Sequence, residues 1–283
     1  MKTEKIALVI EGGGFKSIFS AGVLDAFLIN KFNPFDIYIG VSSGAMSLSY
    51  YIASQYKIYF SLSKEVSVNE KFLGYTHALS EQGYMDLKFL TTYAKKNNPL
   101  ELQKMKESTE NKKFYVVATN LDNGEAVYLE PNKQNIYRCL RATSSLPFFT
   151  KGKCKINGVD LMDGAWSDAI PAKSAADFGA NKIIVIRPHP LNYKVQGLSY
   201  FGLLAGYWWQ NNAKVRDKFF KEHNHYNEAV DFLAKKHKNI EILQICPDNF
   251  LKSGLVGTSK EDLTQDYHHG LEKGMDFLNA NVL

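Results

Sequence analysis

Cysteine is scarce in this chain, and long apolar runs are missing from it. The 283 residues include only Cys139, Cys154 and Cys246, which lie far apart and form no C-x-x-C pair. Neither a disulfide framework nor a zinc site is indicated, and a reducing, cytoplasmic location is the simplest expectation. No stretch approaches the roughly 18 apolar residues of a membrane-spanning helix. The sequence calls for no metal and no organic cofactor.

The start of the chain lacks the features of a secretion signal. Its first apolar run, residues 6–10, is short and ends at Glu11 without a small-residue cleavage site. This pattern indicates a first strand rather than a signal peptide. The formal net charge of +5 is mild. It permits peripheral contact with an anionic membrane surface, and we expect no nucleic-acid partner.

What the chain does have is an alternation of short apolar runs and helix-like segments. The spacing of apolar residues predicts a helix over roughly 15–30. A strand–helix–strand–helix order predicts an α/β fold with a parallel, doubly wound sheet. The expected strands are 5–10, 36–40, 113–119, 125–130, 182–186 and 239–246.

After Pro190 the composition changes, and helices are expected to dominate. We divide the chain into a catalytic domain over 1–190 and a mainly helical part over 191–283 that packs on the same domain. Residues 214–237 are strongly charged and helix-like. The spacing of Thr258 and Glu261 matches a capping box and predicts a final helix to about residue 278.

An aromatic stretch over 198–210 has two interpretations. It could lie at a membrane interface, where tryptophan and tyrosine are enriched. It could instead form a helix packed in the core. The helical spacing of Leu203, Leu204, Tyr207 and Trp208 favours the core.

Ser42 stands in the pentapeptide Gly40-Val41-Ser42-Ser43-Gly44, which has the form G-x-S-x-G. The apolar run 37–39 precedes it, and the helix-like segment 45–52 follows it. A strand, a tight turn and a helix form the context of a nucleophile elbow, which exposes a serine hydroxyl at the end of a strand. The pattern predicts acyl transfer to Ser42, although an ordinary strand-to-helix turn has the same form.

Three adjacent glycines, Gly12, Gly13 and Gly14, stand between the first expected strand and helix. A loop of exposed amides at a helix N-terminus binds anions. Beside a nucleophilic serine, the matching anion is the oxyanion of acyl transfer. A structural turn and a dinucleotide-binding loop are the alternatives. The second fits poorly, because Ser17 occupies the last glycine position of G-x-G-x-x-G and Asp36 precedes the second strand.

A third candidate is Asp163, which is followed by Gly164 and Ala165 and preceded by the apolar stretch 158–162. An aspartate on such a turn can bring its carboxylate to the serine and act as a general base. A plain Asp-Gly turn is the alternative interpretation.

In this order, the glycine loop, the G-x-S-x-G and the later Asp-Gly-Ala resemble the patatin-like phospholipase family. The segment 142–147, Ala-Thr-Ser-Ser-Leu-Pro, is similar to the family's serine-rich segment ahead of the aspartate. The resemblance covers roughly residues 5–187. It implies a lipid acyl hydrolase with a three-layer α/β/α fold and a mainly parallel central sheet. It also implies a Ser42–Asp163 dyad without histidine, an oxyanion hole from the loop amides, and phospholipid or other lipid acyl ester substrates.

The chain departs from the family's Gly-Gly-Gly-x-Arg-Gly pattern at two positions, Lys16 and Ser17. Lysine keeps the positive charge of arginine but loses its planar fork of donors. Serine adds a side chain where the loop usually has none. We therefore expect a less well-formed oxyanion loop, with low activity or a need for an activator.

Two other readings of the function stay open. The order Ser42, Asp163, His189 matches the Ser…Asp…His order of an α/β-hydrolase esterase. An elbow after a single strand is early for that fold. The third reading is a module that binds lipid or nucleotide without catalysis.

Overall fold

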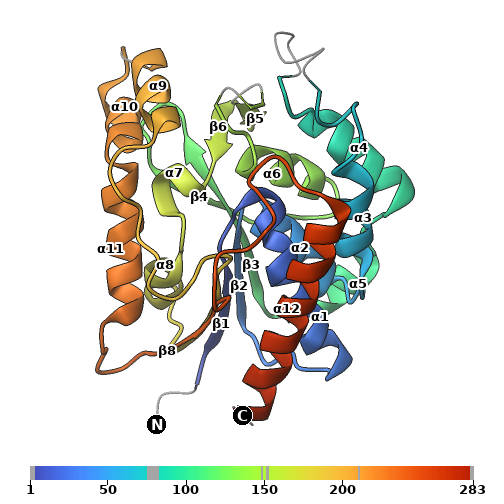
Figure 1. Cartoon of the computed structure of the whole chain (residues 1–283). Helices are drawn as coiled ribbons and strands as arrows, with labels where there is room; N and C mark the ends of the chain where they lie inside the picture. Colours follow the sequence, from blue (N-terminus) through green and yellow to red (C-terminus); the bar gives the residue numbers. More distant parts are fainter. Residues whose placement is uncertain (1–3, 75–82, 148, 151–152, 210, 281–283) are drawn as a thin grey trace.

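The computed structural model describes residues 4–74, 83–147, 149–150, 153–209 and 211–280. At its centre is an eight-stranded sheet with the order β5-β6-β3-β2-β1-β7-β8, in which β4 also pairs with β3 (Figure 1). The strands are β1 (Ile6–Ile10), β2 (Ile37–Val41), β3 (Lys113–Asn120), β4 (Ala126–Leu129), β5 (Cys154–Ile156), β6 (Val159–Asp163), β7 (Lys182–Ile186) and β8 (Glu241–Ile245).

Five neighbouring strands of this sheet, β3-β2-β1-β7-β8, run parallel. Strands β4 and β6 pair antiparallel with β3, and β5 pairs antiparallel with β6. Every residue of β1, β2 and β7 is buried. Parallel strands covered on both faces read as continuous apolar runs, which is why these three were visible in the sequence.

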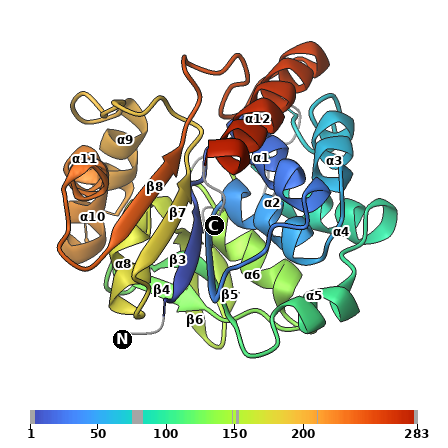
Figure 2. The same ribbon diagram turned by 90° about the horizontal axis from the view of Figure 1, so that it is seen from below.

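Helices cover both faces of the sheet, as the view from below shows (Figure 2). One group comprises η1 (Gly14–Lys16), α1 (Ser17–Ile29), α2 (Ser43–Ile52), α3 (Ile58–Val66), α4 (Leu87–Asn97), α5 (Leu102–Ser108), α6 (Ile136–Thr143) and α12 (Lys260–Ala280). The other comprises α7 (Ala165–Asp168), α8 (Ala172–Asp177), α9 (Tyr200–Trp208), α10 (Ala213–Phe220) and α11 (Glu222–Ala234). The expected three-layer α/β/α architecture with a helical C-terminal third is confirmed.

The C-terminal third shares the sheet and the core with the rest of the chain. Strand β8 pairs in parallel with β7, and α12 lies along α1. A Cβ atom at Gly270 would lie 2.0 Å from the carbonyl oxygen of Phe19, so the two helices touch through their backbones. In the described part of the chain, no helix combines the length and the hydropathy needed to cross a membrane.

Several elements differ from the sequence-based prediction. Strands β5 and β6 and helix α3 were not anticipated, and the charged segment 214–237 contains two helices that meet at Lys221. The final helix begins after Ser259, whose Oγ accepts the Asp262 N–H at 3.0 Å. Ser259 rather than Thr258 is therefore the capping residue, one position later than predicted.

The prediction that the aromatic stretch 198–210 packs in the core was wrong. The stretch does form a helix, α9, but Leu203, Leu204, Tyr207 and Trp208 are all exposed rather than in the core. The helix packs through Ala205, which is fully buried, and the neighbouring glycines. Helical spacing correctly identified one apolar face. The opposite face carries the small residues, and it packs on the protein because small residues allow the closest approach to a neighbouring helix.

Candidate active site

Ser42 occupies a sharp turn between β2 and α2. Its backbone has φ 53° and ψ −132°, a combination that non-glycine residues rarely adopt and that stores strain at functional sites. The turn is tight on both sides. A Cβ at Gly40 would lie 2.5 Å from the Cα of Ala45, and one at Gly44 would lie 2.5 Å from the carbonyl oxygen of Glu11. Both glycines of the G-x-S-x-G pattern are thus required by space, as in a nucleophile elbow.

The hydroxyl of Ser42 donates a hydrogen bond to Asp163, with 2.6 Å between Oγ and Oδ2. The second carboxylate oxygen, Oδ1, accepts the N–H of Ala165 at 2.9 Å. Both Ser42 and Asp163 are buried. The structure therefore brings together the two residues that the sequence singled out 121 positions apart.

The meeting of these two residues follows from the register of β3. Strand β2 pairs with β3 as far as Val41–Val117, and β6 pairs with β3 from Asp163–Ala118 onward. Strand β4 overlaps both stretches, so it lies on one edge of β3 while β2 and β6 share the other. The two strands abut end to end there, and consecutive residues of β3 set the separation of Ser42 and Asp163.

The segment that follows α6 holds both residues in place. The Oγ1 of Thr143 accepts the N–H of Ser42 at 2.7 Å and donates to the carbonyl of Val117. The carbonyl of Ser145 accepts the N–H of Asp163 at 2.9 Å. This is the serine-rich segment of the family resemblance, and its contacts join the elbow to the aspartate.

Burial raises the pKa of Asp163 to about 6, because a carboxylate is poorly solvated there. Hydrogen bonds from Ser42 and the Ala165 amide act in the opposite direction but do not cancel the effect. The carboxyl is thus a stronger base than an exposed aspartate, which suits it to accept a proton from a hydroxyl.

The glycine loop lies directly against the elbow. A Cβ at Gly12 would lie 2.9 Å from that of Ser42, and Gly12, Gly13 and Gly14 line the same cavity as Ser42. The N–H of Gly13 donates to the Oγ of Ser43 at 3.2 Å. That hydroxyl is 2.6 Å from the Oγ of Ser17, one of the two positions that depart from the family pattern. Ser17 thus belongs to a hydroxyl pair that engages one loop amide.

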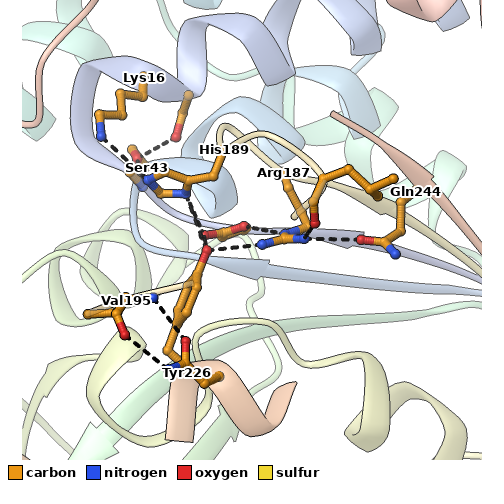
Figure 3. Close-up of polar contacts among 12 residues, drawn as sticks. Lys16, Ser43, Arg187, His189, Val195, Tyr226 and Gln244 are labelled. Atoms are coloured by element: carbon orange, nitrogen blue, oxygen red, sulfur yellow. Dashed lines mark hydrogen bonds and ion pairs between the residues drawn. The ribbon is translucent and has the colours of Figure 1, made fainter. Parts of the chain in front are cut away.

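His189 faces a different partner from the one that a catalytic triad needs. Its Nδ1 lies 2.9 Å from Glu11 Oε1, and its Nε2 lies 3.4 Å from Lys16 Nζ (Figure 3). Among the described residues, His189 has no hydrogen bond to Ser42 or Asp163. The geometry therefore gives no support to a Ser42–His189–Asp163 triad.

Behind the loop lies a buried charge network that the sequence reasoning did not find. Arg187 is fully buried and pairs with Glu11, with 3.1 Å between Nε and Oε2. It also donates to Tyr226 and Gln244 at 3.2 Å each (Figure 3). Burial alone would raise the pKa of Glu11, but His189, Arg187 and Tyr226 hold it below its usual range. The only signals in the sequence were charged residues placed directly after buried strands.

Two cavities meet at Ser42. One of about 350 Å³ contains Asp163, the glycine loop and His189. A narrower one of about 60 Å³ runs between η1, α2, α3 and α4. Its apolar lining includes Phe15, Met46, Leu62, Val66, Phe72, Met85, Leu87 and Leu90. Gly14, Leu146 and Leu255 line both cavities, so an extended molecule could occupy both with Ser42 at its middle.

The three-layer fold, the elbow at Ser42 and the neighbouring aspartate define a protein of the patatin-like class. A family model described as Patatin-like phospholipase matches residues 8–176, and the chain belongs to this family. A second model, described as a domain of unknown function (DUF6363), matches residues 212–282.

The chain is also similar to one protein in sequence and to two solved structures in fold. The chain is 32% identical over 278 residues to the uncharacterized protein YjjU of Escherichia coli (strain K12). The alignment covers 97% of this chain and 77% of YjjU. The crystal structure of VipD from Legionella pneumophila matches with a TM-score of 0.53 at 12% identity, covering 98% of this chain and 67% of VipD. The structure of human GIVD cytosolic phospholipase A2 matches with a TM-score of 0.48 at 10% identity, covering 98% of this chain and 61% of the human protein.

Proposed function

We propose that this chain is a lipid acyl hydrolase in which Ser42 and Asp163 form a catalytic dyad. The observation that carries the proposal is the 2.6 Å hydrogen bond from the elbow serine to a buried carboxylate. Membership of the patatin-like phospholipase family supports a lipid ester as the substrate.

In the proposed reaction, Ser42 Oγ attacks the ester carbonyl while its proton passes to Asp163 Oδ2. The tetrahedral intermediate collapses, the proton goes to the leaving alcohol, and the acyl group remains on Ser42. Asp163 then takes a proton from water, which attacks the acyl-enzyme. The second tetrahedral intermediate collapses, Asp163 returns the proton to Ser42 Oγ, and the carboxylic acid is released. The raised pKa of Asp163 favours both proton transfers near neutral pH.

The amides of Gly12, Gly13 and Gly14 are the proposed oxyanion donors, because their loop lies against Ser42. Loss of one such donor costs roughly 10²–10³ in rate. The Gly13 amide points at Ser43 Oγ in this structure, so it must turn toward the substrate to contribute. This supports the expectation of a low basal activity.

The two cavities suggest how the substrate lies. The narrow apolar cavity suits a hydrocarbon chain, since none of the described residues that line it is charged. The wider cavity contains His189, Tyr193 and Glu222 and suits the polar remainder of the lipid. The scissile ester would then sit between them, over Ser42.

A fluorophosphonate probe tests the proposal without a choice of substrate. We expect covalent labelling of the wild-type chain at Ser42, located by mass spectrometry of the peptides. Ser42→Ala and Asp163→Asn should both lose labelling and reduce ester hydrolysis by about 10³-fold or more. His189→Ala should retain most of the hydrolysis.

Two results would contradict the dyad. Equal damage from His189→Ala and Ser42→Ala would favour the triad. A folded wild-type chain that the probe does not label would favour a binding module without catalysis.

A further inference from the structure

Helix α9 buries its small residues and exposes its large apolar ones, which is the reverse of an ordinary surface helix. Its small residues face the protein: Ala205 is fully buried, and a Cβ at Gly206 would lie 2.4 Å from the ring of Phe220 on α10. A Cβ at Gly202 would lie 2.7 Å from the carboxylate of Glu222. No large side chain could take their place without moving these neighbours. The close contact therefore holds the helix with its bulky side outward.

The outward side is aromatic and aliphatic. The exposed fractions are 70% for Tyr200, 63% for Tyr207 and 74% for Trp208, with Leu203 and Leu204 beside them. We call these five residues the α9 face. Single exposed apolar residues need no explanation, but a cluster of this size on one helix marks an interaction surface.

The N-terminal end of α9 lies beside the wider cavity. Ser199 caps α9, accepting the N–H of Gly202 at 2.9 Å, and it lines the cavity that holds Ser42 and Asp163. Trp166, three residues after Asp163, packs edge-on against Phe219 of α10 at 4.6 Å. Figure 1 shows α9 and α10 at the same end of the molecule as β5 and β6.

Charge around the α9 face favours an anionic partner. Residues 188–222 carry two acidic side chains, Asp217 and Glu222, against five cationic ones: Lys194, Lys214, Arg216, Lys218 and Lys221. Asp217 contacts Arg216 and Lys221, Lys194 pairs with Asp231, and Glu222 accepts the N–H of Ser199. These contacts neutralise part of the positive charge and leave a net excess of cationic side chains around α9. More exposed apolar side chains, Leu198, Phe250 and Leu255, lie at or near the cavity.

We propose that the α9 face docks on an anionic phospholipid membrane and holds the mouth of the cavity at the lipid surface. Tyrosine and tryptophan favour the membrane–water boundary, and flanking lysines add attraction to anionic headgroups. The proposal rests on the proposed function, because a membrane is where a lipid acyl hydrolase meets its substrate.

Cosedimentation with vesicles of phosphatidylcholine, with or without phosphatidylglycerol, tests the docking. We expect the wild-type chain to bind the anionic vesicles more tightly, and added salt to weaken that binding. The double variant Tyr207→Ser/Trp208→Ser should bind about tenfold less tightly or worse. Ile29→Ser is the matched control, since Ile29 is 52% exposed at the far end of α1. It should bind like the wild type.

Labelling by the fluorophosphonate probe separates this proposal from the catalytic one. The double variant should be labelled at the wild-type rate, because neither residue lines the cavity, while its hydrolysis of vesicle lipid falls with binding. Vesicle binding that depends on Trp208 in a chain that the probe cannot label would uphold the docking and overturn the dyad.

Equal vesicle binding by the wild type and the double variant would overturn the docking. So would a wild-type chain that self-associates in sedimentation without vesicles and becomes monomeric in the double variant. The α9 face would then be the interface with a second copy.

Discussion

Arg187 shows how a single buried cation can organise a site that it does not touch. Its guanidinium contacts Glu11, which directly precedes the glycine loop, and Tyr226 and Gln244 from the C-terminal third. A buried ion pair contributes little net stability, because both charges lose their hydration. It does fix geometry, and here it fixes the position at which the loop leaves β1.

Removing one partner of that pair should be costly. Arg187→Met leaves the Glu11 carboxylate buried with fewer partners, so we expect the free energy of unfolding to fall by about 3–5 kcal/mol. Urea denaturation followed by circular dichroism measures it. Lys173→Met is the control, since Lys173 pairs with Asp177 on the surface and should cost less than about 1 kcal/mol. Similar losses in the two variants would refute a buried role for the pair.

The pKa of Asp163 predicts the acid limb of the activity profile. Only the ionised carboxylate can accept the Ser42 proton, so kcat/KM for a soluble ester should fall about tenfold per pH unit below about 6. Asp25 provides the control. Burial also raises its pKa to about 6, but it bonds to Tyr267 and lies outside both cavities. Asp25→Asn should leave the limb in place.

The same shift has a consequence for stability. In the folded chain Asp163 keeps its proton to a pH of about 6, whereas an unfolded aspartate loses it near 3.8. Its ionisation therefore destabilises the fold as the pH rises through this window. The Asp163→Asn variant, which we expect to be inactive, should thus unfold no more easily than the wild type at neutral pH. That result would show that a loss of activity is not a loss of structure.

At the scale of elements, the contact between α1 and α12 joins the C-terminal third to the rest of the chain. Gly270 and Gly22 let the helices touch, since a Cβ at Gly22 would lie 2.1 Å from the carbonyl oxygen of Tyr267. Residues 212–282 match a family model of their own, but α12 packs along α1 and contributes Leu263, Tyr267 and Phe277 to the same core.

A methyl group at this contact should separate the two helices. Gly270→Ala places a carbon within 2.0 Å of the Phe19 carbonyl oxygen, so we expect a loss of about 1–3 kcal/mol in unfolding free energy. Gly257→Ala is the control, because no heavy atom of the described residues, its chain neighbours aside, lies within 4 Å of a Cβ there. A thermal melt in which both variants match the wild type would show that α12 is free to move away.

At the scale of the whole molecule, the sequence revealed what is local and continuous. β1, β2 and β7 are uninterrupted apolar runs, and G-x-S-x-G requires only neighbouring residues. Strand β6 was missed because its Val-Asp-Leu-Met-Asp sequence is short and partly polar. The prediction that the apolar face of α9 is buried was wrong, because periodicity identifies an apolar face but does not show whether other residues cover it.

Within the candidate site, the sequence could not predict contacts between residues that lie far apart along the chain. The residue types at 42, 163 and 12–14 suggested their own chemistry, and the family resemblance supplied the pairing. The contact of Arg187 with Glu11 joins residues 176 positions apart, and the sequence around either residue does not indicate that the other is its partner. The same holds for Thr143 and the Ser42 amide.

The end-to-end abutment of β2 and β6 on β3 has a consequence for how relatives can diverge. The spacing of Ser42 and Asp163 depends on one step along β3, from Val117 to Ala118, and not on the lengths of the intervening segments. Insertions between α2 and β3, or between β4 and β5, can therefore reshape the surroundings of the hydroxyl without shifting it from its carboxylate. A residue added inside β3 would pull the two apart.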